Sequence, residues 1–163
     1  MNKLFVLAAL LITVPCGAVQ SAHPDENPNP SFSLHISAAQ DTVKVGSTIQ
    51  IDLTLANTTD HEISIAYMGA FWVYKFVVLD EKNKPVPPPK PQVSKDGHPI
   101  RRIHVGSGFV RHVEVGKTLG DSIELNGLFD FSQPGKYTIQ AQRMDESAKS
   151  VVKSNQIVLT VSQ

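Results

Sequence analysis

The side chains that could do chemistry in this chain are scattered along the sequence. The six histidines are natural metal ligands, yet none occurs in the H-E-x-x-H or C-x-x-C spacing of zinc sites. His35, His61 and His112 fall among polar strand positions, so we predict solvated surface histidines. Ser107 lies between two glycines, but the G-x-S-x-G pattern of a nucleophile elbow is absent. The sequence therefore predicts a non-enzymatic protein with no catalytic residue and no cofactor.

One alternative for a metal site involves His23. Cleavage after Ala22 would make His23 the first residue of the mature chain, with an amine and an imidazole side by side. Nitrogen donors of this kind suit Cu(II), which makes a copper-binding sandwich the first alternative function. Pro24 follows His23 directly, however, and no strand pattern adjoins it. We therefore predict no metal site and keep His23 as the alternative.

A second alternative depends on the aromatic residues between positions 71 and 79. This segment is almost continuously apolar, which is typical of a central strand covered on both faces. Alternation would place Trp72, Tyr74 and Phe76 on one face of that strand. An exposed aromatic strip could stack on sugar rings, as in a carbohydrate-binding module. Because aromatic side chains bury large areas, we predict that these three belong to the core.

Residues 1–22 have the layout of a secretory signal peptide. Lys3 supplies a positive charge, and an apolar run of 11 residues at positions 4–14 ends at Pro15. That run is shorter than the roughly 20 residues that span a bilayer. Thr13 and Pro15 occupy the positions where a lipobox before Cys16 would need an aliphatic and a small residue. We predict a cleaved signal, a secreted or periplasmic mature chain, and no stable membrane insertion.

The charge balance of the mature chain is close to neutral. Residues 1–22 hold one basic and no acidic residue, so 14 Lys and Arg remain against 15 Asp and Glu. A protein that binds nucleic acid through its phosphates needs a basic excess, which argues against nucleic acid as a partner. Cleavage also removes Cys16, the only cysteine, so a disulfide within the mature chain is excluded.

Apolar and polar residues alternate through most of the mature chain. Residues 23–30 contain three prolines and predict an exposed leader. Period-two alternation then predicts seven to nine strands, and no long segment has helical periodicity. The predicted strand segments are 32–36, 43–45, 49–55, 63–67, 71–79, 103–115, 123–129, 137–142 and 156–161. We predict one all-β domain over residues 31–163, an antiparallel two-sheet immunoglobulin-like sandwich.

The segment Gln133-Pro134-Gly135-Lys136-Tyr137-Thr138-Ile139 resembles the tyrosine corner of immunoglobulin-like domains. In that motif a tyrosine near the start of a strand hydrogen-bonds to the preceding loop. The resemblance assigns that role to Tyr137 and the tight turn before it to Pro134 and Gly135. It places Ile139 where antibody domains carry a cysteine, so we expect an aliphatic contact between the sheets, with Ile51 or Leu53 as its partner.

Residues 115–161 are similar to immunoglobulin-like modules of secreted bacterial proteins, and the overall order distantly resembles the BsuPI-type proteinase-inhibitor domain. The similarity is carried by PGKYTIQAQR and VVKSNQIVLTV, with weaker pattern agreement over residues 31–80. It implies a β-sandwich, and it makes an inhibitor-like role one form of protein binding. No inhibitory residue can be transferred by position, because a fold hosts many functions.

The segment at 85–108 differs in composition from the rest of the chain. Five prolines occur at positions 85–91, which excludes a central strand there. Residues 75–111 carry eight basic and three acidic side chains, whereas the rest of the mature chain is acidic. Long loops on rigid scaffolds often carry function. We predict that this loop binds an acidic surface of an envelope protein, with a second copy of this chain or a protease as alternatives, through Lys95, His98, Arg101, Arg102 and Ile103.

Overall fold

The computed structural model describes residues 29–91, 95–96 and 108–163. Nine strands are present in this part of the chain, which agrees with the predicted number. Their bounds are β1 Phe32–Ala38, β2 Thr42–Lys44, β3 Gln50–Asn57, β4 Ile63–Tyr67, β5 Lys75–Leu79, β6 Phe109–Val113, β7 Thr118–Glu124, β8 Gly135–Asp145 and β9 Ser150–Ser162. One helical turn, α1, spans Ala70–Val73, and a 3₁₀ turn spans Leu125–Gly127.

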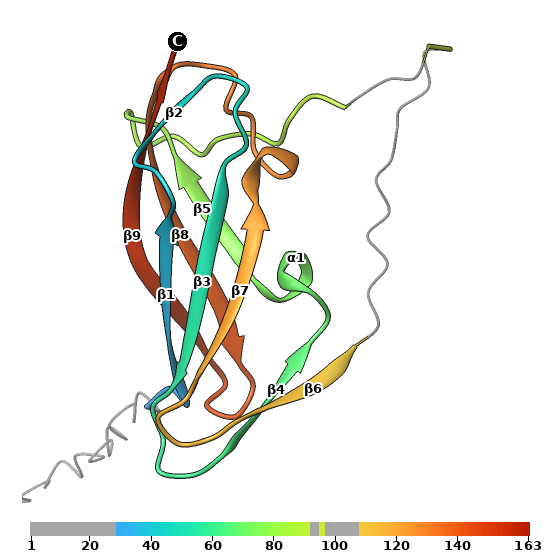
Figure 1. Ribbon diagram of the computed structural model, residues 1–163, viewed down its shortest axis with the longest axis vertical. Coiled ribbons are helices and arrows are strands. Elements are labelled where there is room, and N and C mark those ends of the chain that lie inside the picture. The colour runs from blue at the N-terminus through green and yellow to red at the C-terminus, as the bar shows by residue number, and fades with distance from the viewer. Residues whose placement is uncertain (1–28, 92–94, 97–107) are drawn as a thin grey trace, which may run out of the picture.

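The strands form two packed sheets and a separate ribbon. One sheet has the order β1-β3-β7, and the other has the order β2-β9-β8-β5. Figure 1 shows these sheets as two layers, with the two-stranded β4–β6 ribbon extending from one end. All these pairings are antiparallel except the short parallel pair of β2 with β9. The predicted all-β sandwich is confirmed, and the ribbon is an addition to it.

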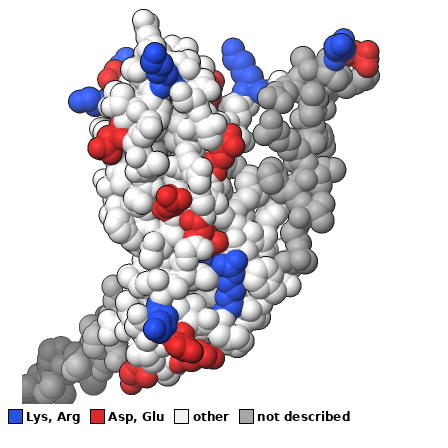
Figure 2. Space-filling model, in the orientation of Figure 1, with Lys and Arg blue, Asp and Glu red and all other residues white. Residues whose placement is uncertain are grey.

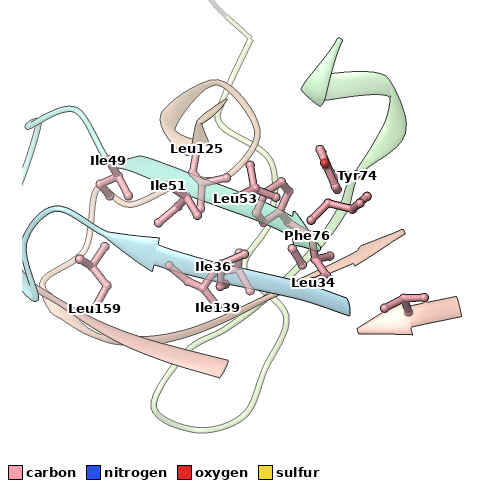
Figure 3. Close-up of a cluster of buried hydrophobic side chains, with 14 of the residues drawn as sticks. Leu34, Ile36, Ile49, Ile51, Leu53, Tyr74, Phe76, Leu125, Ile139 and Leu159 are labelled. Atoms are coloured by element: carbon pink, nitrogen blue, oxygen red, sulfur yellow. The ribbon is translucent and has the colours of Figure 1, made fainter. Parts of the chain in front are cut away.

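The core lies between the two sheets and follows the alternation of the strands. In β3 the burial alternates residue by residue, and Ile51, Leu53 and Leu55 are at most 1% exposed. Ile139 of β8 belongs to the same buried cluster and is fully inaccessible to solvent. Figure 3 shows Ile139 in the cluster that also contains Ile36, Ile51 and Leu53. Ile139 of one sheet and Ile51 and Leu53 of the other thus belong to one buried aliphatic cluster, while the direct contact expected between them stays a prediction.

The tyrosine corner forms as predicted. The Tyr137 hydroxyl donates a hydrogen bond of 2.6 Å to the carbonyl of Gln133, four residues earlier. Pro134 lies between these two residues, and Gly135 begins β8. The Tyr137 ring packs edge-on against Phe131 with 5.0 Å between ring centroids. The hydroxyl therefore fixes the bend before β8, while the ring adds to the core.

A single side chain joins the edge of one sheet to the other. The Asn155 side-chain oxygen accepts a 2.8 Å hydrogen bond from the amide of Ile36, and its nitrogen donates a 3.0 Å bond to the carbonyl of the same residue. Asn155 lies in β9 and Ile36 in β1. The Asn155 amide group thus satisfies the backbone amide and carbonyl of Ile36 at the edge of β1.

The predicted central strand at residues 71–79 begins later than expected and lies at the edge of its sheet. Residues 70–73 form α1, and β5 starts only at Lys75. Gly69 precedes the turn with φ 96°, a conformation that favours glycine, and its carbonyl accepts from the amides of Trp72 and Val73. The prediction was wrong here because a four-residue turn is too short to show helical periodicity. Within the described part of the chain, no helix is long and apolar enough to cross a membrane.

Candidate functional site

The predicted binding loop at 85–108 is described at residues 85–91, 95–96 and 108. Lys95 lies in an exposed turn with Asp96. His98, Arg101, Arg102 and Ile103 lie outside the described residues, so their binding role stays a prediction. Figure 2 shows acidic and basic side chains interspersed over the described part of the face in view. The described residues on this face therefore offer no extended area of one charge.

Trp72 is exposed, contrary to the prediction that it belongs to the core. Its side chain lies on α1 and is 55% exposed, whereas Tyr74 and Phe76 are buried as predicted. The helical turn causes this difference, because it ends the period-two alternation that would have placed Trp72 on the same face as Tyr74. An exposed strip containing both Trp72 and Tyr74 therefore does not exist.

Other large apolar side chains are exposed close to α1. Met68 and Phe109 are each 49% exposed, and Phe71 is 36% exposed. The Phe71 and Trp72 rings meet edge-on at 5.1 Å. Met68 approaches Gly108, since a Cβ placed on that glycine would lie 3.4 Å from the Met68 Cγ. We call Met68, Phe71, Trp72 and Phe109 the aromatic surface.

Tyr67 connects the two parts of the aromatic surface. Its ring lies 5.1 Å from the Phe109 ring, its direct partner in the β4–β6 ribbon. Its hydroxyl donates a 2.7 Å hydrogen bond to Asp121 of β7, the strand against which α1 packs. Burial raises the pKa of Tyr67, and the Asp121 carboxylate raises it further, while Arg111 and the Ala70 amide oppose the rise. Tyr67 therefore stays protonated as a donor at neutral pH.

A buried carboxylate lies beneath this surface. The Asp121 side chain is only 5% exposed and accepts hydrogen bonds from the hydroxyls of Tyr67 at 2.7 Å and Tyr74 at 3.0 Å. The Arg111 guanidinium lies 3.7 Å from the same carboxylate and 4.0 Å from the centre of the Tyr67 ring. One carboxylate thus ties β4, β6 and β7 to the residue that precedes β5.

Arg143 completes this buried cluster from β8. It is 6% exposed, and its Nη2 donates a 2.6 Å hydrogen bond to the carbonyl of Ala66 in β4. Its guanidinium lies 5.1 Å from the centre of the Tyr74 ring, and its Nη1 is buried without a hydrogen-bond partner. Burial raises the pKa of Tyr74 to about 12, with Asp121 adding to the rise and Arg143 opposing it. The cluster keeps two tyrosines neutral and contains no exposed nucleophile.

Sequence reasoning missed the two buried charges of this cluster, although the alternation held a signal for each. Asp121 occupies the inward position between Leu119 and Ile123, and Arg143 occupies the inward position after Ala141. A charged residue at an apolar position of an alternating strand predicts a buried ion with a partner. The pattern alone does not say which residues meet it.

The described histidines are all surface residues. His35 contacts Asn155, His61 pairs with Asp60 at 2.9 Å, and His112 pairs with Glu62 at 3.1 Å. Within the described ranges no three metal-ligating side chains gather in one place. His23 lies outside those ranges, so the copper alternative stays an expectation from the sequence.

No family model matches the chain, and no curated protein is significantly similar to it. Among solved structures, the CARDB domain of a Pyrococcus furiosus protein is 13% identical, with a TM-score of 0.43 over 85% of this chain and 97% of that one. The Pseudomonas fluorescens alkylpurine DNA glycosylase AlkC, bound to DNA, is 12% identical with a TM-score of 0.44 over 82% of this chain. An Erythrobacter marinus β-glucosidase is 14% identical with a TM-score of 0.44 over 82% of this chain.

This chain spans 31% of the glycosylase chain and 16% of the glucosidase chain. The CARDB domain is a β-sandwich, the class that this chain's own strands define. The resemblance to the BsuPI-type inhibitor domain is not among these findings and remains a prediction from the sequence.

Proposed function

We propose that this chain is an exported, non-enzymatic immunoglobulin-like module that binds another protein in the cell envelope through its aromatic surface. The observation that carries the proposal is the exposure of Trp72, at 55%, in a part of the fold where Met68, which follows Tyr67 in the sequence, and Phe109, which pairs with Tyr67 in the ribbon, are also exposed. Tryptophan, methionine and aromatic residues are enriched at the centres of protein interfaces. A folded domain that leaves them exposed together presents a candidate docking site.

The buried cluster beneath the surface supports this proposal. Asp121 and Arg143 hold β4 against the sandwich through hydrogen bonds of 2.7 Å from Tyr67 and 2.6 Å to the Ala66 carbonyl. Asp121 also accepts a 3.0 Å bond from Tyr74, which follows α1, and lies 3.7 Å from Arg111 of β6. Rigid support lowers the ordering cost of binding, so the exposed rings are held ready for a partner. The predicted export signal in residues 1–22 favours a partner in the envelope or outside the cell.

Two further forms of the function stay open in this proposal. Inhibition of a protease would be one kind of protein binding, as the sequence resemblance suggests. Sugar binding now depends on Trp72 without Tyr74, because the Tyr74 hydroxyl is bound to Asp121.

The test compares Trp72→Ala with Val158→Ala in the mature chain. Both side chains are 55% exposed, but Val158 lies on β9 of the main sheet. We expect Trp72→Ala to reduce recovery of a crosslinked envelope protein at least about tenfold, which is ~1.4 kcal/mol, while Val158→Ala leaves it unchanged.

Equal recovery with both variants would refute the aromatic surface as the binding site. Binding to polysaccharide that is lost only in Trp72→Ala would support a carbohydrate-binding module instead.

A further inference from the structure

Residues 85–91 have the sequence Pro-Val-Pro-Pro-Pro-Lys-Pro and do not belong to the aromatic surface. We call them the ridge. Five of the seven residues are prolines, each of which fixes φ near −65°. Lys84, Val86 and Lys90 each precede a proline, which disfavours the helical region for them as well. The sequence therefore dictates a polyproline II conformation, with three residues per turn.

Burial along the ridge has this three-residue period. Val86 is buried and Pro89 is partly buried, whereas Pro85, Pro88 and Pro91 are exposed. One edge of the ridge thus packs on the domain, and the edge that carries Pro85, Pro88 and Pro91 faces solvent. Lys90 lies two residues after Pro88, next to that exposed edge.

Backbone hydrogen bonds join the ridge to β5 and to the segment that precedes β8. The amide of Val86 donates a 2.9 Å bond to the carbonyl of Val78 in β5, and the amide of Asp130 donates a 2.8 Å bond to the carbonyl of Pro87. Before the ridge, the Asp80 carboxylate accepts bonds of 2.8 Å from the amides of Lys82 and Lys84. Figure 1 shows the segment that follows β5 crossing the end of the sandwich opposite to the β4–β6 ribbon.

We propose that the ridge at residues 85–91 is a second docking element, a preformed polyproline II ligand for a protein groove lined by aromatic side chains. Such grooves recognise prolines three residues apart, as at Pro85 and Pro88, because the extended helix is ordered before it binds. The basic residue at Lys90 completes a P-x-x-P-x-K pattern and calls for a carboxylate at the edge of the partner's groove. The proposal does not depend on the aromatic surface.

The charges around the ridge fit this orientation. Hydrogen bonds from Ser132 lower the pKa of Asp130, and the nearby Lys90 ammonium lowers it slightly further. Lys90 is exposed and adds positive charge next to the exposed edge of the ridge, which a partner's carboxylate would complement. A groove lined by Asp80, Asp130 and Tyr137 runs beside Pro85 and Pro87.

The first test uses an isolated SH3 domain selective for P-x-x-P-x-K as a probe of groove recognition. Titrated with the whole mature chain, it should bind saturably at its aromatic groove, as followed by NMR of the labelled probe. Pro88→Ala and Lys90→Glu should each weaken binding about tenfold, or ~1.4 kcal/mol. The matched controls Pro30→Ala and Lys153→Glu, both exposed and away from the ridge, should bind like the unaltered chain.

A synthetic peptide of residues 84–91 should bind the probe more weakly than the mature chain, because the peptide pays the ordering cost on binding. No saturable binding by the mature chain, or equal binding by Pro88→Ala and Pro30→Ala, would overturn the proposal. Neither result affects the aromatic surface, which Trp72→Ala tests separately.

The second test places a photo-crosslinking residue at position 88, with position 138 as control, in cells that export the chain. A crosslink that maps to an aromatic-lined groove of another protein, at position 88 only, supports the proposal. Crosslinks confined to a second copy of this chain, or equal yields at both positions, would overturn it.

Discussion

Pairs of aromatic side chains lie at two places in this molecule. The distance between the rings is similar at both, but one pair is buried and the other is exposed to solvent. At the tyrosine corner the Phe131 and Tyr137 rings are 5.0 Å apart, and both residues are 5% exposed. Near α1 the Phe71 and Trp72 rings are 5.1 Å apart, and Trp72 is 55% exposed. The first pair packs into the core, whereas the second lies on a helical turn beside a ribbon that belongs to neither main sheet.

The two places also differ in what lies beneath the rings. Below the tyrosine corner the core is aliphatic, and Ile139 and Leu125 are fully buried. Below the aromatic surface lies a charged cluster around Asp121 and Arg143. Apolar burial thus stabilises the sandwich, while directional hydrogen bonds orient the ribbon and α1. We therefore expect the loss of one hydrogen bond to destabilise the protein more in the ribbon than at the tyrosine corner.

The largest expected effect is in the aliphatic core. Ile139→Ala should lower the free energy of unfolding by about 4 kcal/mol, because the residue is fully buried between the sheets. Chemical denaturation measures this loss, with Val151→Ala, an exposed β9 residue, as control. A loss below about 1 kcal/mol would contradict the role of Ile139 as a contact between the sheets.

Removing the buried carboxylate should have the next largest effect. Asp121→Ala leaves two tyrosine hydroxyls and Arg111 without their acceptor, which should cost about 3 kcal/mol of stability. Asp121→Asn keeps one acceptor oxygen and should cost less. Trp72 is the only tryptophan, so its fluorescence also reports whether α1 shifts. Unchanged stability and emission in Asp121→Ala would show that the ribbon is held by other contacts.

Alkaline titration should act on the same cluster with a smaller effect. The folded-state pKa of Tyr74 is raised from 10.0 to about 12, so the neutral hydroxyl is favoured by folding. The contribution of this pKa shift to the free energy of unfolding is complete below pH 10 and is lost as the pH rises toward 12. The free energy of unfolding should therefore fall in this window, and less steeply in Tyr74→Phe. If the free energy of unfolding fell equally steeply with pH in both proteins, the raised pKa would not belong to Tyr74.

At the tyrosine corner we expect the smaller effect of removing one hydrogen bond. Tyr137→Phe removes the 2.6 Å bond to the Gln133 carbonyl but keeps the ring packing, so we expect a loss of about 1 kcal/mol. Thermal unfolding compared with that of Tyr67→Phe would sharpen the contrast between the two places. The Tyr67 hydroxyl donates to a charged acceptor, so Tyr67→Phe should lower the free energy of unfolding more than Tyr137→Phe does. The reverse order would argue that the corner depends on its hydrogen bond more than the ribbon does.

The smallest effect on stability is expected at the surface itself. Trp72→Ala should change the free energy of unfolding by less than about 0.5 kcal/mol, because the side chain is more than half exposed. Strong quenching of Trp72 fluorescence by acrylamide would accompany this result. A large loss of stability would mean that Trp72 packs as a core residue.

The sequence alone determined the features that depend on neighbouring residues. Alternation predicted the strands of the sandwich, the Pro-Gly-Lys-Tyr turn predicted the tyrosine corner, and the prolines excluded a central strand after position 84. Each of these follows from local backbone preference or from the period of side chains along a strand. The places of Tyr137 and Ile139 in the fold could be predicted for the same reason, because both lie within one short turn and the strand that follows it.

Only the tertiary structure decided which apolar faces are covered. Alternation gives the side on which a residue lies, but whether another sheet covers that side depends on pairings between distant segments. The β4–β6 ribbon pairs residues more than 40 positions apart, and α1 lies beside it because Gly69 bends the chain after β4. That long-range arrangement leaves Trp72 exposed and brings Asp121 together with Tyr67 and Tyr74. Local sequence patterns do not predict it.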